Sequence, residues 1–590
     1  MEMSGKRVVL GSCVGGGPME RLARRLEERG IAAQVVSLDS PESWRARMGT
    51  PRGRLLARVR AFVGTPVAAV RAAFERDDQV LVPTTNPFFL PAVLVATRPL
   101  HGRAVVPLIY DLYPDALEAG GVETGPLARA AEALNRFVFR NADGVVFIGE
   151  KMAEHARARY GAPRRDAVFE TGVDTAELRA PKRVESPLET WLDEAPDALV
   201  LSYVGNLGLV HDVDTLAGVL SGIGRFGGRL RVVIAATGPG LPALVAAAAD
   251  SPHIRLEPPL DDAAWARLLA RSHLSVATLK PAAFRTSIPS KALSAMGAGS
   301  AVLALAPLDS DLGALVERHA AGKVFAPGDS EAVLAWLAAL SKDELATLRT
   351  NARRAAEEHY DLAVLAARWE RFLGVCAERR DADPVYDALK RALDVLVAGT
   401  ATLALAPILA ATAAAVAVNL GRPVVFEQRR PGRGGRVFLI RKFRTMREPR
   451  PHELGPEFDA ARLTPVGRAL RAASLDELPT LLTVLAGHMS LVGPRPLLER
   501  YLPRYTPRQA RRHEVPPGVT GWAQANGRNA TTWDERFEQD IFYVENRSLW
   551  LDLRVLARTV RTVLRRDGIS QSGHATMPEF LGPESQGAAA

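Results

Sequence analysis

The chain has 590 residues, more than one hydrophobic core usually organises, and its 47% hydrophobic and 24% charged residues exclude a disordered chain. Its two cysteines, Cys13 and Cys376, suggest neither a disulfide framework nor a zinc site, which fits a reducing cytosol. The net charge of +9 arises entirely after residue 384, where 29 Lys or Arg face 20 Asp or Glu, as at an anionic membrane, a nucleic acid or a phosphorylated substrate.

The first 375 residues alternate short apolar runs with amphipathic stretches, the pattern of parallel sheets covered by helices. Two apolar runs, Arg7–Gly11 and Leu199–Val204, each lead into a glycine-rich turn and predict two similar halves. The charged, proline-bearing stretch Lys182–Pro196 is expected to be a hinge between them. A helix over Leu362–Cys376 is expected to close the region. The start of the chain leads into a strand, so no secretory signal is expected.

Glycine-rich turns between a strand and a helix allow backbone amides to approach an anion. Gly15, Gly16 and Gly17 form such a turn, with Gly16 as the candidate contact. The full dinucleotide-binding spacing is missing, and a simple tight turn explains these glycines equally well.

The wider pattern of this region resembles the GT-B glycosyltransferases of the family 4 type that act on lipid-linked sugars in bacterial surface polysaccharide assembly. The resemblance spans most of residues 6–375. It rests on Asp111-Leu112-Tyr113-Pro114-Asp115, Asn141-Ala142-Asp143, Gly172-Val173-Asp174, Gly205-Asn206-Leu207-Gly208, Gly238-Pro239-Gly240 and Pro289-Ser290-Lys291. It implies two Rossmann-like halves with a nucleotide sugar and an acceptor in the cleft. Asp111 and Gly205 would line that cleft, and Lys291 would suit the diphosphate.

One departure from this family concerns two glutamates, spaced EX7E, that it commonly carries near the donor. This sequence has Thr286 and Ser294 where they would fall. Either Ser294 contacts the donor ribose less strongly and the domain remains active, or the domain only binds a lipid-linked sugar or a nucleotide sugar.

An acidic pair, Asp476-Glu477, marks the C-terminal region. Ser474 and Glu477 have the spacing of a capping box, which predicts that the pair lies in the first turn of a helix. Such a pair can also hold a divalent cation, with the helix N-terminus beside a phosphate. Cationic side chains that suit phosphate oxygens lie in short stretches with Gly or Pro: Lys442, Arg444, Arg471, Arg495 and Arg528.

These stretches resemble the bacterial sugar transferases, the monotopic phosphoglycosyl transferases. Four ordered motifs carry the resemblance: Lys442-Phe443-Arg444-Thr445-Met446, Ser474-Leu475-Asp476-Glu477-Leu478-Pro479, Met489-Ser490-Leu491-Val492-Gly493-Pro494-Arg495-Pro496, and Pro517-Gly518-Val519-Thr520-Gly521-Trp522-Ala523-Gln524-Ala525-Asn526-Gly527-Arg528.

The resemblance implies covalent catalysis. Asp476 would attack the β-phosphate of a UDP-sugar, release UMP and pass the phosphosugar to polyprenyl (undecaprenyl) phosphate. Mg²⁺ at Asp476 would neutralise the diphosphate, and Glu477 would assist the acceptor or orient the nucleophile. The Lys442, Arg471, Arg495 and Arg528 side chains would grip phosphate, while Gln524 and Asn526 would shape the pocket.

An apolar segment, residues 392–420, is expected to meet lipid. Its uncharged part, Val395–Leu420, would be about 39 Å long as a helix at roughly 1.5 Å per residue. Positive residues flank both ends, starting with Lys390 and Arg422, as expected where both ends lie in the cytoplasm. Pro407 is therefore predicted to break a re-entrant helix, although Ala406 replaces the serine usual in the family. A plain transmembrane helix is the alternative.

The stretch Leu549–Arg566 predicts an amphipathic helix with Trp550 near its start. One helical face carries Leu549, Leu553, Leu556, Val560 and Val563, and the arginines lie off that face. Either a packed core helix or a helix lying at the membrane interface explains this pattern.

These inferences predict an α/β chain with four parts. Residues 1–181 and 182–376 would be the acceptor and donor halves of a GT-B domain, residues 384–570 a mainly α, membrane-associated phosphoglycosyl transferase, and residues 571–590 a flexible tail. The predicted enzyme makes a polyprenyl-diphosphate sugar and adds a second sugar from another nucleotide sugar, at the cytoplasmic face of the bacterial inner membrane, in exopolysaccharide biosynthesis. The alternative is a single transferase with a non-catalytic GT-B module. No nucleic-acid-binding motif is present, and a homo-oligomer is possible.

Overall fold

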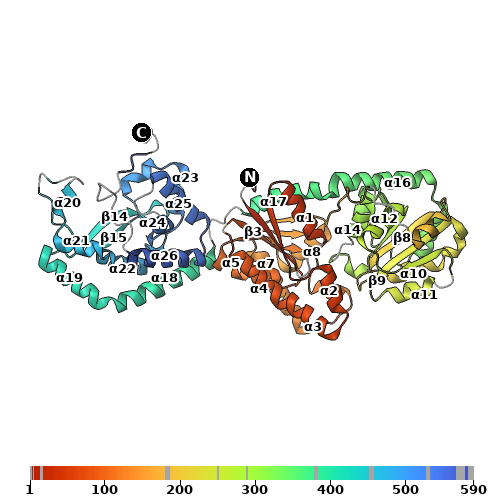
Figure 1. Ribbon diagram of the computed structural model, residues 1–590, viewed down its shortest axis with the longest axis horizontal. Coiled ribbons are helices and arrows are strands. Elements are labelled where there is room, and N and C mark those ends of the chain that lie inside the picture. The colour runs from red at the N-terminus through yellow and green to blue at the C-terminus, as the bar shows by residue number, and fades with distance from the viewer. Residues whose placement is uncertain are drawn as a thin grey trace. The chain divides into compact units, whose positions relative to one another are not determined.

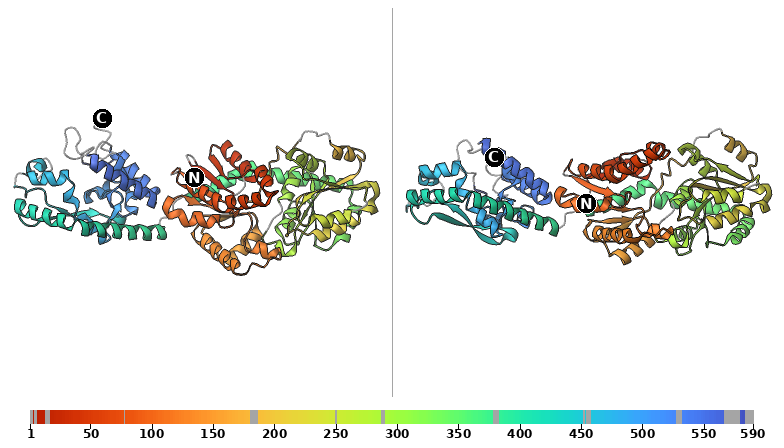
Figure 2. Two further views of the ribbon diagram at one scale, coloured as in Figure 1. Left: turned by 60° about the horizontal axis from the view of Figure 1, so that its bottom comes forward. Right: turned by 90° about the horizontal axis from the view of Figure 1, so that it is seen from below.

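The computed structural model describes residues 3, 6–12, 17–76, 78–179, 186–248, 251–286, 290–377, 383–450, 453, 458–526, 532–565 and 579–582. The chain divides into two compact units: residues 1–97 with 103–378, and residues 98–102 with 379–590. Figures 1 and 2 show both units as ribbons.

The first half of the N-terminal unit is built on parallel strands. Strand order is β2-β1-β3-β4 in one sheet and β5-β6-β7 in another, and Thr84 pairs with Leu108 between them. The elements are β1 (Arg7–Gly11), α1 (Pro18–Glu28), β2 (Ala32–Val36), α2 (Pro41–Met48), α3 (Pro51–Val59), the π-helical turn η1 (Arg60–Gly64), α4 (Thr65–Ala73), β3 (Gln79–Pro83), α5 (Leu90–His101), β4 (Ala104–Val105), β5 (Leu108–Ile109), α6 (Asp115–Ala119), α7 (Gly125–Asn141), β6 (Val145–Phe147), α8 (Glu150–Tyr160) and β7 (Asp166–Val168).

The second half carries a six-stranded parallel sheet in the order β10-β9-β8-β11-β12-β13. Its elements are α9 (Pro187–Asp193), β8 (Leu199–Asn206), α10 (Val213–Ser221), η2 (Ile223–Arg229), β9 (Leu230–Thr237), α11 (Leu241–Ala248), β10 (Ile254–Glu257), α12 (Asp262–Arg271), β11 (Leu274–Thr278), η3 (Pro281–Ala283), α13 (Lys291–Gly297), β12 (Ala301–Leu305), α14 (Asp311–Arg318), β13 (Gly322–Phe325), α15 (Ser330–Ala339), α16 (Lys342–Ala355), η4 (Ala356–Tyr360) and α17 (Leu362–Ala377). Strands β11 and β12 are fully buried, as expected of a parallel sheet covered on both faces. The predicted pair of Rossmann-like halves is confirmed.

The stretch predicted as a hinge is partly helical. Helix α9 begins after Ser186, whose side chain accepts a hydrogen bond from the Glu189 amide. Leu188 and Leu192 of α9 are buried against the second half. The hinge prediction was therefore wrong for these residues, because apolar positions four apart supply a face that packs. The predicted boundary at residue 182 lies outside the described residues.

The C-terminal unit is mainly helical, as predicted, with an antiparallel hairpin (β14 with β15) and a parallel pair (β16 with β17). Its elements are α18 (Pro384–Ala404), α19 (Ala406–Leu420), β14 (Val425–Pro431), η5 (Arg433–Gly435), β15 (Val437–Phe443), α20 (Asp459–Arg462), α21 (Pro465–Ala472), η7 (Leu475–Glu477), α22 (Thr480–Leu485), β16 (Ser490–Val492), η8 (Glu499–Arg504), α23 (Pro507–Ala510), η9 (Arg511–Glu514), β17 (Gly518–Thr520), α24 (Trp522–Asn526), α25 (Trp533–Glu545) and α26 (Leu549–Arg565).

The apolar segment forms two helices. Within the described ranges no single helix is long and apolar enough to cross a membrane, whereas α18 and α19 together meet that test with a bend of 63° between them. The break falls at Leu405, and Pro407 lies in the first turn of α19, where its missing amide leaves no hydrogen bond unmade. Pro407 thus lies in the first turn of the second helix and not in the interior of one long helix.

The positive residues before this segment are engaged within the unit. Lys390 is buried and donates to Asp552 Oδ2 at 2.9 Å, and Arg391 donates to the carbonyls of Val484 and Leu485 at 2.6 and 2.7 Å. Both side chains therefore hold α18 against neighbouring helices, and their placement at a cytoplasmic flank stays a prediction.

Helix α26 combines the two alternatives left open by its sequence. Leu551, Asp552 and Val555 are buried in the unit, whereas Leu553 and Val560 are 49% and 59% exposed. Trp550 is also exposed, and the Arg554 guanidinium lies 5.4 Å from its ring centroid. One face therefore packs and another stays open.

The predicted flexible tail contains an anchored segment. Phe580 is fully buried among Tyr501, Trp533 and Phe537, with a ring-centroid distance of 5.0 Å to Phe537. Glu579 accepts from Arg500 and Arg504. The tail prediction was wrong for residues 579–582, because a single aromatic residue with two nearby ion pairs is enough to hold this segment.

Asp552 accepts hydrogen bonds from Lys390, Tyr386 and Tyr543. We expect Asp552→Asn to lower the free energy of unfolding by about 3–5 kcal/mol, because it leaves the buried Lys390 ammonium without a counter-charge. Thermal unfolding of the detergent-solubilised protein measures the change. Glu427→Gln, which removes an exposed partner of Arg441, is the control and should change stability by less than about 1 kcal/mol. Equal melting temperatures for the two variants would contradict the assignment.

Candidate active sites

Two of the C-terminal motifs meet along β16 and β17. The Gly493 amide donates to Thr520 O at 2.9 Å, and the Gly518 amide donates to Pro494 O at 3.0 Å. A Cβ at Gly493 would lie 2.4 Å from Pro516 O, so only glycine allows the two backbones to approach this closely. The parallel pair therefore fixes Arg495, which follows this contact directly.

A buried ion pair holds the backbone of Arg495. Arg512 donates to Asp540 Oδ2 at 3.0 and 2.6 Å and to Arg495 O at 2.8 Å. Both Arg512 and Asp540 are at most 3% exposed in their side chains. Because the guanidinium is planar and held by Asp540, it fixes the position of the Arg495 backbone.

The acidic pair lies in the short 3₁₀ turn η7, between α21 and α22. Ser474 precedes it with a left-handed backbone, φ 57°, and its side chain makes no capping hydrogen bond. The predicted capping box was therefore wrong, because Ser474 does not adopt the extended conformation that a cap requires. A non-glycine residue in this conformation is strained by about 1–3 kcal/mol, which is typical of functional sites.

Glu477 lies between two cations. Its Oε1 accepts from Lys442 Nζ at 2.6 Å and from Arg495 Nη2 at 3.1 Å. Burial alone would raise the pKa of Glu477, but the charges and hydrogen bonds of Arg495 and Lys442 outweigh burial and lower this pKa to about 2. Glu477 is therefore ionised at neutral pH, and it brings together residues from three of the four motifs.

Asp476 has a different environment. Burial, and next the negative charge of Glu477, raise the pKa of Asp476, while Lys442 and Arg471 partly offset this rise. Arg471 is held in turn by Thr445, because its Nε donates to Thr445 Oγ1 at 3.0 Å. Asp476 is a partly desolvated carboxylate next to fixed cations, an arrangement suited to a nucleophile that attacks a phosphate.

The other residues predicted for this site differ in their hydrogen-bond partners. Arg444 donates to the carbonyls of Leu420 and Gly421 at the end of α19, so its role as a phosphate ligand stays a prediction. Gln524 donates to Val519 O at 3.4 Å, and its Oε1 is buried without a hydrogen-bond partner. Asn526 accepts from Arg558. Arg528 lies outside the described residues.

Among the described residues, no three His, Cys, Asp or Glu side chains converge as a metal site would require. Mg²⁺ commonly binds through one or two carboxylates together with substrate phosphates and water. Asp476 fits such an ion as its protein ligand, whereas Glu477 is already paired with two cations.

The N-terminal unit gathers a second set of candidates at the carboxyl edge of its six-stranded sheet. Lys291 Nζ donates to Asn206 O at 2.9 Å and lies 2.8 Å from His211 Nε2. A Cβ at Gly205, where φ is 116°, would lie 2.9 Å from Lys291 Cε. Glycine therefore lets the lysine cross the end of β8. Ligands of open α/β sheets bind at this edge.

Burial lowers the pKa of Lys291 to about 8. Burial and the charge of Lys291 lower the pKa of His211 to about 4, so this imidazole is neutral at pH 7. An anion such as a diphosphate would compensate the buried ammonium. His211 was not identified from the sequence, because a lone histidine after Gly208 gives no motif to find.

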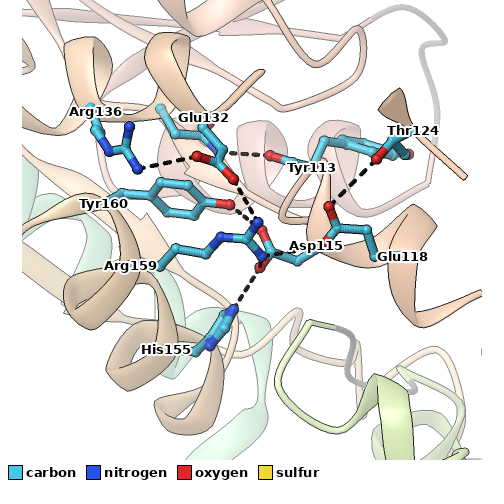
Figure 3. Close-up of polar contacts among 10 residues, drawn as sticks. Tyr113, Asp115, Glu118, Thr124, Glu132, Arg136, His155, Arg159 and Tyr160 are labelled. Carbon is cyan, nitrogen blue, oxygen red and sulfur yellow. Dashed lines mark hydrogen bonds and ion pairs between the residues drawn. The ribbon is translucent and has the colours of Figure 1, made fainter. Parts of the chain in front are cut away.

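The two acids of the Asp111–Asp115 stretch differ in role. Burial raises the pKa of Asp111, which follows β5 at the sheet edge. Asp115 instead accepts hydrogen bonds from Arg159 and Tyr160, and its Oδ1 lies 2.6 Å from His155 Nε2 (Figure 3). Asp115 therefore holds α6 to α8, and Asp111 is the candidate for ligand contact.

The departures from the glycosyltransferase pattern have a structural explanation in part. Thr286 is buried and donates to Ala283 O at 3.2 Å, so its hydroxyl is already used. Ser294 is half-buried in α13, with Ser290 O at 3.5 Å from its hydroxyl. Gly16 lies outside the described residues.

Two family models match the chain. Residues 385–566 match the family model described as bacterial sugar transferase, and residues 19–177 match the one described as glycosyltransferase family 4. The chain is 51% identical over 194 residues to an uncharacterised sugar transferase, EpsL, of Bacillus subtilis, and covers 96% of that protein with 33% of its own length. The chain belongs to the bacterial sugar transferase family. It is an enzyme of this class that also carries a glycosyltransferase domain, and both resemblances found in the sequence are confirmed.

A relative with a named activity is the UDP-glucose:undecaprenyl-phosphate glucose-1-phosphate transferase of Caulobacter vibrioides, 43% identical over 191 residues, with 31% of this chain covering 72% of that protein. The chain covers less than half of several other relatives, such as 45% of an N-acetylgalactosaminephosphotransferase of Aeromonas hydrophila at 39% identity. Among solved structures, HepE of Anabaena in complex with UDP covers 62% of this chain at 14% identity, with 99% of that protein covered and a TM-score of 0.46.

Proposed function

We propose that the C-terminal unit transfers a phosphosugar from a UDP-sugar to undecaprenyl phosphate through a covalent intermediate on Asp476. The observation that carries this proposal is the pairing of a partly desolvated Asp476 with Glu477, whose two cations, Lys442 and Arg495, come from separate motifs. The named activity of the Caulobacter relative supports the substrate class.

In the first step a carboxylate oxygen of Asp476 forms a bond to the β-phosphorus of the UDP-sugar. The bond from that phosphorus to the oxygen bridging the two phosphates breaks, and UMP leaves with the electron pair. In the second step a phosphate oxygen of undecaprenyl phosphate attacks the same phosphorus and displaces Asp476. Lys442, Arg471 and Arg495 stabilise the negative charge on the phosphate in both steps.

In this proposal Glu477 orients the cations beside Asp476. With its pKa lowered to about 2 by two ion pairs, it is a poor proton acceptor at neutral pH, and it fixes Lys442 and Arg495 beside the nucleophile. Mg²⁺ bound at Asp476 would supply charge neutralisation of the substrate diphosphate. Gln524, Asn526 and Arg528 are proposed to complete the pocket.

We propose that α18 and α19 enter the membrane as a re-entrant pair from the cytoplasmic face of the bacterial inner membrane. The 63° bend at Leu405 and the exposed Leu396, Leu403 and Val418 support this placement. The 67–90% exposure of these three side chains suits lipid contact and is costly in water.

We further propose that the N-terminal unit adds a second sugar from another nucleotide sugar, in the assembly of an exopolysaccharide. Lys291, with its neutral neighbour His211, is the candidate ligand of the donor diphosphate, and Asp111 lies at the candidate acceptor side. The buried, hydrogen-bonded Thr286 favours a second candidate, a module that binds the lipid-linked sugar without transferring to it.

Replacing Asp476 by Asn should lower UMP release by at least about a thousandfold, because the amide is a poor nucleophile, and should remove any phosphosugar adduct from the protein. Purified protein in detergent is incubated with undecaprenyl phosphate, Mg²⁺ and a panel of UDP-sugars, and UMP and UDP are measured separately. UMP reports the first transfer and UDP the second. Glu538→Gln, which removes an exposed partner of Arg508, is the control and should keep the normal rate. Full turnover by Asp476→Asn would disprove the covalent role.

The lowered pKa of Lys291 predicts a pH-dependent affinity for UDP. An ammonium with a pKa of about 8 loses roughly ninety per cent of its charge by pH 9, so affinity should fall about tenfold between pH 7 and pH 9. Calorimetric titration of the full chain checks this. Lys291→Arg should remove the decline, because guanidinium stays charged, and Lys291→Met reports binding at the other site. An unchanged decline in Lys291→Met would assign the effect elsewhere.

The re-entrant arrangement predicts that both ends of the helix pair face the cytoplasm. Single cysteines at Val385 and Arg422, both exposed in the structure, should react with an impermeant maleimide only from the cytoplasmic side of oriented vesicles. Cys13→Ser removes one native thiol, and Cys376 is buried. A label that reacts only from the outer side would show that the segment crosses the membrane.

A further inference from the structure

A second apolar surface lies on the N-terminal unit, on the continuous helical stretch formed by α3, η1 and α4. Helix α3 lies at the edge of this unit (Figure 1). Six large apolar side chains of the stretch are 47–66% exposed: Leu55, Leu56, Val59, Phe62, Val63 and Val67. They recur at intervals of three and four residues, so neighbouring turns present them along one side of the helix.

The small residues of this stretch face the opposite way. Ala57, Ala61, Ala69, Ala72 and Ala73 are at most 3% exposed and lie on the protein side. A helix selected only to fill the core would place its leucines and phenylalanine inward and its alanines outward. The reversed order indicates that the large apolar side chains serve a contact outside this unit.

The charge of the stretch is of one sign. Residues 43–74 contain no Asp or Glu, and Arg52, Arg54, Arg58 and Arg71 are exposed beside the apolar side chains. Arg47 and Arg60 turn back to the unit and pair with Asp39, whose Oδ2 accepts from Arg60 at 3.3 Å. A helix with an apolar stripe and only arginines around it is typical of binding to an anionic lipid surface.

We propose that α3, η1 and α4 form a membrane-docking surface that inserts its six apolar side chains among anionic lipids. Lipid is favoured over a second copy of the chain, because a dimer about this surface would bring arginines against arginines without acidic partners. The same chain carries the apolar pair α18 and α19. If this pair enters a bilayer, it raises the effective concentration of lipid around the N-terminal unit.

Aromatic contacts lead from this surface toward the candidate acceptor side. Ring centroids are 5.9 Å apart for Phe62 and Phe89, 5.4 Å for Phe89 and Phe88, and 6.1 Å for Phe88 and Tyr113. Tyr113 stands two residues after Asp111. If the proposed second transfer holds, this apolar route lets a polyprenyl chain remain in lipid while its sugar enters the cleft; the docking surface itself does not depend on that transfer.

The test places an environment-sensitive NBD probe on a single cysteine at Val63 of the full chain, reconstituted in vesicles that contain phosphatidylglycerol. Lys342, whose side chain is 91% exposed on the same unit, carries the matched control probe. Both probe variants are made in the Cys13→Ser chain. The Cys13→Ser chain without an added cysteine is treated with the same reagent and reports any labelling of Cys376. The probe at position 63 should shift to the blue and be quenched severalfold by lipids with spin-labelled acyl chains, and the control probe should not.

Charge is tested by the triple variant Arg52→Gln, Arg54→Gln, Arg58→Gln, which should lose most of the quenching, as should the unaltered chain in purely zwitterionic vesicles. Equal, weak quenching at positions 63 and 342 would overturn the proposal. A blue shift that appears in detergent and grows with protein concentration would assign the surface to a second copy instead. The fluorescence readout needs no sugar transfer. If the probe is quenched but the protein adds no second sugar, only the proposed glycosyltransferase activity is overturned.

Discussion

The carboxylate of Asp552 joins the main elements of the C-terminal unit. It accepts from Lys390 and Tyr386 on α18 and from Tyr543 on α25, and the oxygen of the Tyr543 hydroxyl also lies 3.0 Å from Val492 O at the end of β16. Val492 directly precedes Gly493, whose close contact with β17 fixes Arg495. One buried acid therefore links the apolar helix to the strand that supports Arg495, the arginine of the candidate site. Buried ionic groups are costly unless they are paired, and here the carboxylate has one counter-charge and two hydroxyl donors.

Asp476 and Glu477 of η7 are adjacent in sequence but have different electrostatic environments. Both are partly withdrawn from water, which favours the neutral carboxyl. Glu477 accepts hydrogen bonds from Lys442 and Arg495 and stays ionised, whereas the charges of Lys442 and Arg471 offset the burial of Asp476 only in part, and its pKa is raised. The strained Ser474 sets this geometry, because its left-handed backbone prevents the regular helix start that would cap both residues. Two residues adjacent in sequence thereby have pKa values shifted in opposite directions, and Glu477 joins Lys442 to Arg495.

Much of the fold was predictable from local patterns. Strand β1 and helix α17 have nearly the predicted bounds, because apolar periodicity and glycine turns determine them locally. The motif residues Lys442, Glu477 and Arg495 do meet, although only their resemblance to a family indicated this. The Arg512–Asp540 pair and the engagement of Lys390 by Asp552 could not be predicted, because each joins residues far apart in sequence and neither residue type is expected in a core. His211 beside Lys291 was missed because a single histidine outside any motif gives no signal in the sequence.

The burial of Phe580 changes how the end of the chain should be regarded in protein engineering. Its ring fills a space bounded by Tyr501, Trp533 and Phe537, beyond a stretch whose composition looks dispensable. A truncation placed after α26 would open an apolar cavity beneath η8 and α25, at a cost of about 3–5 kcal/mol for a deleted phenylalanine side chain. An affinity tag is therefore better appended after the final residue than substituted for the last twenty.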